Sequence, residues 1–173
     1  MSTSLRHIFS ILLANESGVL TRVSGLFSAR GYNIESLTVA PTVDKSLSRM
    51  TIVTTGEDKV AEQIGKQLHK LIDVIEVSDF SGEKHVEREM LLAKIANDNN
   101  EERTQTIYEL AQDCGAEVIE CLDKFCVVQM MAAGSQIDNF INKAKAQHHR
   151  ILEVARSGAI TLSRSAHILG GNQ

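Results

Sequence analysis

The chain is poor in the residues that would make it a membrane protein or a nucleic-acid-binding protein. Aromatic residues make up 4 % of its 173 residues and tryptophan is absent. No stretch approaches the roughly 18 apolar residues of a membrane-spanning helix. The net charge is −4 and the pI is near 5.9, which argues against a broad basic surface for DNA or RNA. We therefore expect no nucleic-acid partner and no membrane partner.

Cysteine is also scarce. Cys114, Cys121 and Cys126 are odd in number and are separated by six and four residues, which matches neither a disulfide scaffold nor a paired zinc motif. The sequence predicts reduced thiols in or near the core. Because the N-terminal stretch has no apolar signal segment, we expect a cytoplasmic protein.

The common catalytic signatures are missing as well. There is no Gly-x-Gly-x-x-Gly, Walker loop, His-Glu-x-x-His or Gly-x-Ser-x-Gly. Glu83, Glu87 and Glu89 alternate with basic residues, which favours a solvated face over an acid–base pair. His148 and His149 are adjacent, so on a strand they would point to opposite sides, and they lack companion ligands. We predict no catalytic residue and no metal site.

What is present is one pattern of strands and helices that occurs twice. Apolar periodicity and turn residues predict, in the first half, strands at 7–14, 34–41, 46–55 and 74–78 and helices at 19–30 and 60–71. In the second half they predict strands at 87–96, 116–122, 125–132 and 150–156 and helices at 107–114 and 137–144. Each half has the order of a ferredoxin-like βαββαβ unit. We therefore predict an α+β fold made of two such units.

The expected boundaries are a first unit at 5–80, a linker at 81–86, a second unit at 87–157 and a frayed tail at 158–173. In each unit the helices should cover one face of a four-stranded antiparallel sheet, which leaves the other face and one edge uncovered. Pro41 cannot donate to a strand ladder and suits the end of an exposed edge strand. A second copy is the economical cover for that edge, so we predict a homodimer through the first unit.

The candidate ligand site is the turn between the first strand and the first helix, Asn15-Glu16-Ser17-Gly18-Val19-Leu20. Helix N-terminal N–H groups attract a carboxylate, and Gly18 lets it come close to the backbone. The Asn15 amide can accept from an ammonium, and Val19 and Leu20 can wall a short aliphatic side chain. An ordinary helix cap by Asn15 or Ser17 explains the same residues. The turn therefore predicts either an amino-acid site or a cap.

A second candidate lies at the start of the second strand, where Asn33 and Ile34 follow Gly31. The amide of Asn33 can bond a ligand's carboxylate or ammonium, or it can cap a turn. The same order of elements also describes the RNA-recognition motif, but the third strand, residues 47–54, has no aromatic residue on which a base would stack.

Several stretches together closely resemble the regulatory small subunit of acetohydroxyacid synthase, also called acetolactate synthase. They are residues 15–20, 30–42, 47–53, 85–89 and 153–158. The resemblance spans both units, although residues 97–149 are less distinctive. It implies an ACT domain at the N-terminus and a ferredoxin-like domain at the C-terminus.

The resemblance also implies a function. A chain of this kind is not an enzyme on its own and carries no cofactor. It binds a separate catalytic large subunit that uses thiamine diphosphate, Mg²⁺ and FAD to join two pyruvates, or pyruvate and 2-oxobutyrate, toward valine, leucine and isoleucine. The small subunit activates that partner and confers feedback inhibition, usually by valine. The alternative is a free-standing ACT-domain amino-acid sensor that controls another enzyme or a transcription factor.

The same resemblance assigns the effector contacts. They fall on Asn15, Gly18 and Asn33, with five residues around them: Glu16, Ser17, Val19, Leu20 and Ile34.

Overall fold

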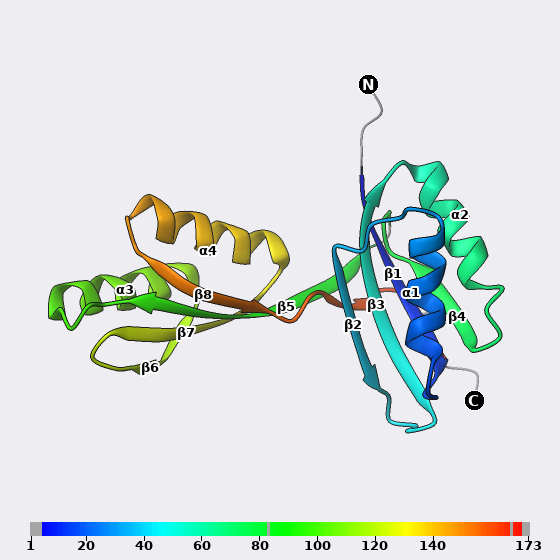
Figure 1. Cartoon of the computed structure of the whole chain (residues 1–173), viewed down its shortest axis with the longest axis horizontal. Coiled ribbons are helices and arrows are strands. Elements are labelled where there is room, and N and C mark those ends of the chain that lie inside the picture. Colours follow the sequence, from blue (N-terminus) through cyan, green and yellow to red (C-terminus); the bar gives the residue numbers. More distant parts are fainter. Residues whose placement is uncertain (1–4, 83, 167, 171–173) are drawn as a thin grey trace. The chain divides into compact units, whose positions relative to one another are not determined.

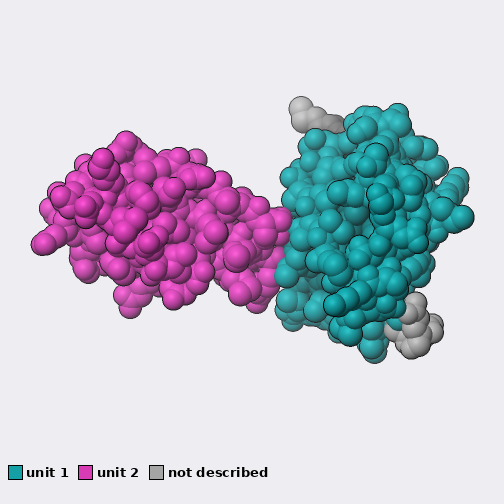
Figure 2. All heavy atoms as spheres, turned by 60° about the horizontal axis from the view of Figure 1, so that its bottom comes forward, with its two compact units in different colours: residues 1–86, 159–173 teal, residues 87–158 magenta. Residues whose placement is uncertain are grey.

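The computed structural model describes residues 5–82, 84–166 and 168–170. The chain forms two compact units, residues 1–86 with 159–173 and residues 87–158 (Figure 2). Each unit has the predicted order of strands and helices, so the predicted α+β fold with two βαββαβ units is confirmed (Figure 1).

The first unit contains β1 (Leu5–Ala14), α1 (Val19–Ala29), β2 (Ser36–Pro41), β3 (Leu47–Gly56), α2 (Asp58–Leu68) and β4 (Val74–Asp79). Its sheet has the order β2-β3-β1-β4 and is antiparallel throughout. Phe9 on β1 packs with Phe27 of α1 and Ile64 of α2, which places both helices on one face of the sheet. β2 is an edge strand and Pro41 ends it, as predicted.

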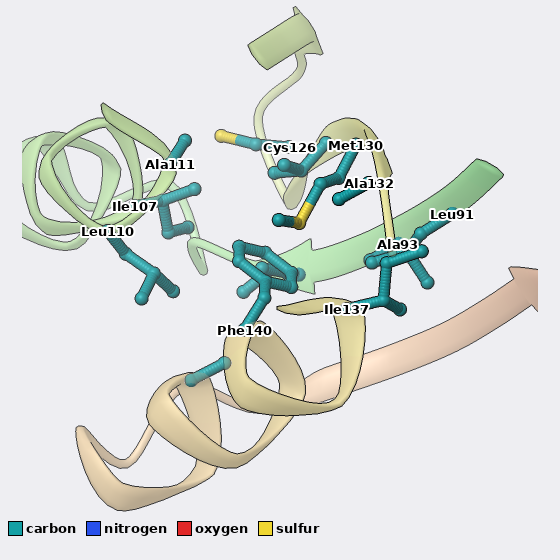
Figure 3. Close-up of a cluster of buried hydrophobic side chains, with 13 residues drawn as sticks. Leu91, Ala93, Ile107, Leu110, Ala111, Cys126, Met130, Ala132, Ile137 and Phe140 are labelled. Carbon is teal, nitrogen blue, oxygen red and sulfur yellow. The ribbon is translucent and has the colours of Figure 1, made fainter. Parts of the chain in front are cut away.

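The second unit contains β5 (His85–Ala96), α3 (Glu101–Cys114), β6 (Glu117–Cys121), β7 (Phe125–Ala132), α4 (Gly134–Ala146) and β8 (Ile151–Arg156). The strands lie in the order β6-β7-β5-β8. Figure 3 shows the core, in which Ile107 of α3 and Phe140 of α4 pack against Leu91 of β5 and Met130 of β7. Alternate residues of β5 and β7 point into this core, as expected for a sheet covered on one face.

The tail is not frayed, and this prediction is wrong. β9 (Ile160–Ser163) pairs with β5. Ala159 is 2 % exposed and packs with Ile8, Val53 and Phe80 on the face of the first sheet that the helices do not cover. The backbone N–H of Gly170 donates to Glu76 Oε2 at 2.8 Å. The C-terminal segment therefore returns to the first unit; residues 171–173, the last of the predicted tail, lie outside the described residues.

The prediction of reduced thiols is wrong for two of the three cysteines. Cys121 and Cys126 form a disulfide across the β6–β7 hairpin, where their Cα atoms are 4.0 Å apart. They are register partners in the strand ladder, which brings the two side chains together. Cys114 is free, and burial raises the pKa of its thiol.

The predicted solvated acidic face is wrong for Glu89. This residue is 7 % exposed, and Arg156 Nε and Nη2 donate to its two carboxylate oxygens at 2.6 and 2.8 Å. Arg156 also donates to Asp138 of α4 at 2.6 Å. The hydrogen bonds that Arg156 donates to Glu89 raise the pKa of the guanidinium. Glu83, from the same predicted cluster, lies outside the described residues.

Candidate functional site

The candidate site is built where β1 ends at Ala14 and α1 begins at Val19. Gly18 has φ +87° and ψ −12°, a left-handed conformation that glycine adopts without steric cost. A Cβ atom at Gly18 would lie 3.2 Å from Nη1 of Arg22. The absence of a side chain at Gly18 therefore leaves both the backbone and one guanidinium nitrogen open to a ligand.

The carboxylates near the N-terminus of α1, Asp73 and Glu16, act on Arg22. Within the described residues no side chain caps this helix, and its first turn contains no acidic residue. The alternative in which Asn15 or Ser17 caps the helix is therefore not observed. The dipole of α1 therefore meets no side-chain cap among the described residues.

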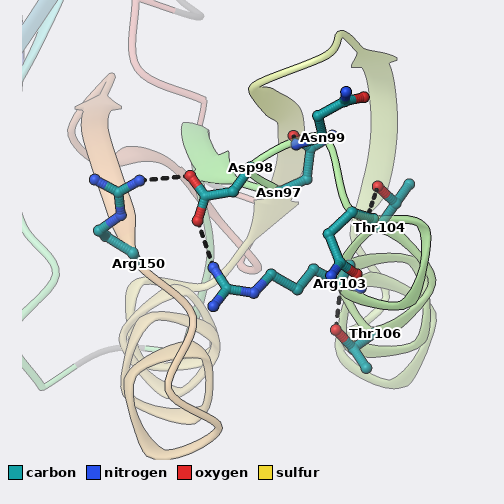
Figure 4. Close-up of polar contacts among 8 residues, drawn as sticks. Asn97, Asp98, Asn99, Arg103, Thr104, Thr106 and Arg150 are labelled. Carbon is teal, nitrogen blue, oxygen red and sulfur yellow. Dashed lines mark hydrogen bonds and ion pairs between the residues drawn. The ribbon is translucent and has the colours of Figure 1, made fainter.

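The corresponding turn of the second unit has a helix cap and ion pairs of its own. Figure 4 shows the ion pairs of Asp98. Asn100 Oδ1 accepts from the backbone N–H of Arg103 at 2.9 Å and so caps α3. Asp98 pairs with Arg103 and, at 2.7 Å, with Arg150. The start of α3 therefore has a side-chain cap, whereas among the described residues the start of α1 has none and its nearby Asp73 carboxylate pairs with Arg22.

Asn15 has a structural role that the sequence did not predict. Its backbone N–H donates to Ser46 O at 2.7 Å, and its Nδ2 donates to Lys45 O at 2.9 Å. Both bonds hold the turn between β2 and β3. The side-chain Oδ1 has no partner among the described residues and is the atom that can accept from an ammonium.

Arg22 is the residue of this site that the sequence analysis missed. Its Nε and Nη2 donate to the Asp73 carboxylate at 2.6 and 2.9 Å, and this bond raises the pKa of the guanidinium. Asp73 O in turn accepts from Ala14 N at 2.9 Å. Arg22 is therefore held beside Gly18, four residues away on the same face of α1. The four-residue spacing between Gly18 and Arg22 was the sequence signal that could have identified Arg22.

The remaining residues of the turn differ in exposure. Glu16 and Ser17 are exposed and Leu20 is 45 % exposed, whereas Val19 is 2 % exposed and belongs to the core. The backbone N–H of Val19 donates to Glu16 O at 3.4 Å, and Leu20 is the apolar side chain on the outer surface.

Asn33 and Ile34 lie far from this turn within one chain. Thr54 Oγ1 donates to Asn33 O at 2.5 Å, whereas Asn15 is bonded to Ser46 at the other end of β3. Thr54 lies eight positions after Ser46, which corresponds to about 25 Å of strand. One copy of the chain therefore brings together residues 15–20 but does not bring Asn33 to them.

Among the described residues no group of three His, Cys, Asp or Glu side chains is placed to hold a metal ion. No helix in the described ranges is both long enough and apolar enough to cross a membrane.

Two family models match the chain. A model described as AHAS small subunit-like ACT domain matches residues 9–76. A model described as small subunit of acetolactate synthase matches residues 88–165. The fold, the open turn at Gly18 and the first match define an ACT-domain protein.

Whole-chain comparisons give the same result. The acetolactate synthase isozyme 3 small subunit of Salmonella typhimurium is 48 % identical over 166 residues, which cover 95 % of this chain and 99 % of that protein. A probable acetolactate synthase small subunit of Archaeoglobus fulgidus is 39 % identical over 92 % of this chain and 98 % of its own. The crystal structure of the acetolactate synthase small subunit of Thermotoga maritima superposes with a TM-score of 0.81 at 34 % identity and covers 94 % of this chain and 99 % of that chain. The chain belongs to the family of acetolactate synthase small subunits.

Proposed function

We propose that this chain is a regulatory subunit that activates a catalytic large subunit of acetolactate synthase and lowers its activity when valine binds. The observation that carries the proposal is the uncapped start of α1 at Gly18, beside the fixed guanidinium of Arg22. Together they form a seat for the carboxylate of an amino acid. The family supplies the large subunit as the partner.

The proposed site is completed by a second copy of the chain. β2 is an edge strand, and its last three residues, Val39, Ala40 and Pro41, are exposed. If two β2 strands pair antiparallel about a two-fold axis, Ser36 of each lies opposite Pro41 of the other. Asn33 of the partner subunit then lies near the turn at residues 44–46, which Asn15 contacts. In such a dimer Asn15 of one copy would lie near Asn33 of the partner subunit, although the two residues are far apart within one chain.

Valine would lie in this seam. Its carboxylate accepts from the first N–H groups of α1 and from Arg22, and its ammonium donates to Asn15 Oδ1 and to the amide of Asn33 of the partner subunit. Its side chain packs on Leu20. Inhibition requires valine to bind one arrangement of the dimer better than another, and couplings of this kind amount to about 1–3 kcal/mol.

Calorimetric titration of the full chain with valine tests the site. Asn33→Ala removes an exposed amide for which the described residues provide no side-chain partner, so it should weaken valine binding at least tenfold and leave the fold unchanged. Asn139→Ala, an exposed asparagine on α4, is the matched control and should bind as the unaltered chain does. Equal valine affinity in the two variants would contradict the assignment.

Co-purification tests the partner. A tagged chain should retain a large subunit that carries thiamine diphosphate, Mg²⁺ and FAD, and adding it to that subunit should raise the rate of acetolactate formation. Capture of a transcription factor instead would favour a free-standing sensor. The partner's cofactors and the cytoplasmic location stay predictions.

A further inference from the structure

The disulfide between Cys121 and Cys126 lies at the turn end of the β6–β7 hairpin. β6 is an edge strand of the second sheet, and the two cysteines are the last pair of the ladder before the turn at 123–124. Beyond them the backbone N–H of Leu122 donates to Phe125 O at 2.8 Å and closes the turn. The hairpin therefore keeps the two cysteine side chains opposite each other whether or not the sulfur atoms are bonded.

The two cysteines differ in their access to solvent. Cys126 is 0 % exposed and belongs to the core shown in Figure 3, whereas Cys121 on the edge strand is partly exposed. In thiol–disulfide exchange a thiolate attacks one sulfur atom and the other sulfur leaves as a thiolate. An outside thiol approaches from the side of Cys121, so Cys126 is the leaving group.

Asn97 provides a hydrogen-bond donor to that leaving group. This residue is 4 % exposed, and its Nδ2 donates to Leu122 O at 2.8 Å and lies 3.7 Å from Cys126 Sγ. The amide nitrogen carries two hydrogens, so both bonds form at once. Burial disfavours a thiolate, whereas a hydrogen bond to it favours the charged form, and a more stable thiolate leaves faster. The Asn97 amide therefore favours breakage of the disulfide on the side of Cys126.

The same asparagine connects the hairpin to the start of α3. The backbone N–H groups of Asn97 and Asp98 both donate to Lys124 O, at 3.1 and 3.4 Å. The backbone O of Asn97 accepts at 3.0 Å from the N–H of Asn100, the residue that caps α3. Figure 4 shows this turn, in which Asn97, Asp98 and Asn99 precede the helix. A change in how firmly the hairpin is held therefore reaches the first turn of α3.

We propose that Cys121 and Cys126 are a reversible thiol–disulfide couple, that Asn97 is the positioning residue that stabilises the Cys126 thiolate, and that the state of the couple controls the order of the turn before α3. The proposal does not rest on the proposed valine site, which lies in the first unit.

Glutathione is the reductant and glutathione disulfide is the oxidant of this couple. A glutathione thiolate bonds to Cys121 Sγ, the disulfide breaks, and its electron pair leaves on Cys126 Sγ, which takes up a proton. A second glutathione thiolate attacks the glutathione sulfur of the mixed disulfide and releases Cys121 as a thiolate, which takes up another proton. Both protons come from the two glutathione thiols, which end as one glutathione disulfide. The reverse sequence oxidises the pair again.

Redox titration of the folded full-length chain in mixtures of glutathione and glutathione disulfide tests the couple. Cys114→Ala removes the free third thiol, so that alkylation and mass spectrometry count only Cys121 and Cys126. Both should be free in excess glutathione and both bonded in excess glutathione disulfide, with the same transition in either direction. A disulfide that resists glutathione until urea unfolds the chain would overturn the proposal, and so would two free thiols in every mixture.

The rate of reduction tests Asn97. Asn97→Asp removes the donor and places a negative charge beside Cys126 Sγ, so it should slow reduction by glutathione roughly tenfold. Asn142→Asp makes the same change on the exposed surface of α4 and should react at the unaltered rate. A merely structural role gives the opposite sign, because a less stable unit opens more often and is reduced faster. Reduction of Asn97→Asp as fast as that of Asn142→Asp, or faster, would contradict the role of Asn97.

Amide hydrogen exchange tests the connection to α3. The backbone N–H of Asn97 should exchange about tenfold faster in the reduced chain than in the oxidised chain. The N–H of Ala14, which donates to Asp73 O in the first unit, is the internal control and should exchange equally in both. Equal exchange at Asn97 in the two states would contradict the connection. Failure of valine to bind would count against the proposed function and leave the redox couple standing.

Discussion

Replacing Gly18 by alanine or by aspartate should rank the variants in one order of stability and in another order of valine affinity. Alanine at φ +87° costs about 1–2 kcal/mol because its Cβ is crowded in the left-handed conformation. Aspartate tolerates this conformation better, and its charge near a helix N-terminus returns about 0.3–1 kcal/mol. We therefore expect the free energy of unfolding to fall in the order Gly18, Gly18→Asp, Gly18→Ala. Valine affinity should instead fall in the order Gly18, Gly18→Ala, Gly18→Asp, because aspartate occupies the position of the ligand's carboxylate.

The control is Gly25, which lies in the middle of the same helix. No atom comes within 4 Å of a Cβ placed there, so Gly25→Ala should stabilise α1 by about 0.5–1 kcal/mol. Gly18 and Gly25 are roughly 10 Å apart along the helix axis, so their effects should add. The double variant Gly18→Asp with Gly25→Ala should be within about 1 kcal/mol of the unaltered chain in stability and still fail to bind valine.

The assay uses the distribution of tyrosines. The chain has two tyrosines and no tryptophan. Tyr32 packs edge-on against Phe27 of α1 in the first unit, and Tyr108 lies on α3 in the second. In a Tyr108→Phe background, fluorescence during urea unfolding therefore reports on the first unit alone. Valine binding by the double variant with unchanged affinity would refute the site, and a Gly18→Ala variant as stable as the unaltered chain would refute the backbone argument.

Three further predictions concern stability. Glu89→Gln leaves Arg156 without its buried carboxylate and should lower the free energy of unfolding of the second unit by about 1–3 kcal/mol, followed by Tyr108 fluorescence; no loss would contradict the buried pair. Ending the chain after Gly158 uncovers Phe80 and should lower the urea midpoint of the first unit, whereas a frayed tail would leave it unchanged. Burial, and then a nearby arginine, lowers the pKa of His149, so the unfolded chain binds more protons. Stability of the second unit should fall as the pH drops through about 6.5, and His149→Gln should flatten that slope in urea titrations at pH 5–8.

The repeated fold was predictable because its strands and helices carry strong local signals. Apolar alternation and turn residues predicted the order of the elements β1 to β8 and α1 to α4, and Pro41 marked the edge strand. The disulfide between Cys121 and Cys126 could also have been predicted from the sequence. A two-residue turn at 123–124 places Cys121 opposite Cys126, so the predicted hairpin already paired them. Only the expectation that an odd cysteine count means reduced thiols stood against it.

Other features depend on long-range packing that no local pattern encodes. The separation of Asn33 from Asn15 follows from the register of β3, and the pairing of Arg22 with Asp73 joins two residues far apart in the chain. The short segment Ile160–Ser163 has the composition of a strand, but nothing in it indicates that it pairs with β5 and covers the first sheet. These contacts join residues far apart in the chain, which is why the turn at residues 15–20 was predictable and its surroundings were not.

The central claim is that valine is bound between two copies of the chain, and mixing two defective variants tests it most directly. Gly18→Asp should not bind valine alone, and Asn33→Ala should bind it at least tenfold more weakly than the unaltered chain. In a mixed dimer, one site carries both defects and the other carries neither, because the intact turn of one copy meets the intact Asn33 of the other. After equal amounts are unfolded together and refolded, calorimetry should recover roughly a quarter of a valine site per chain at the unaltered affinity. If the mixture binds no more valine than the separate variants, the site does not lie across two copies and the account is wrong.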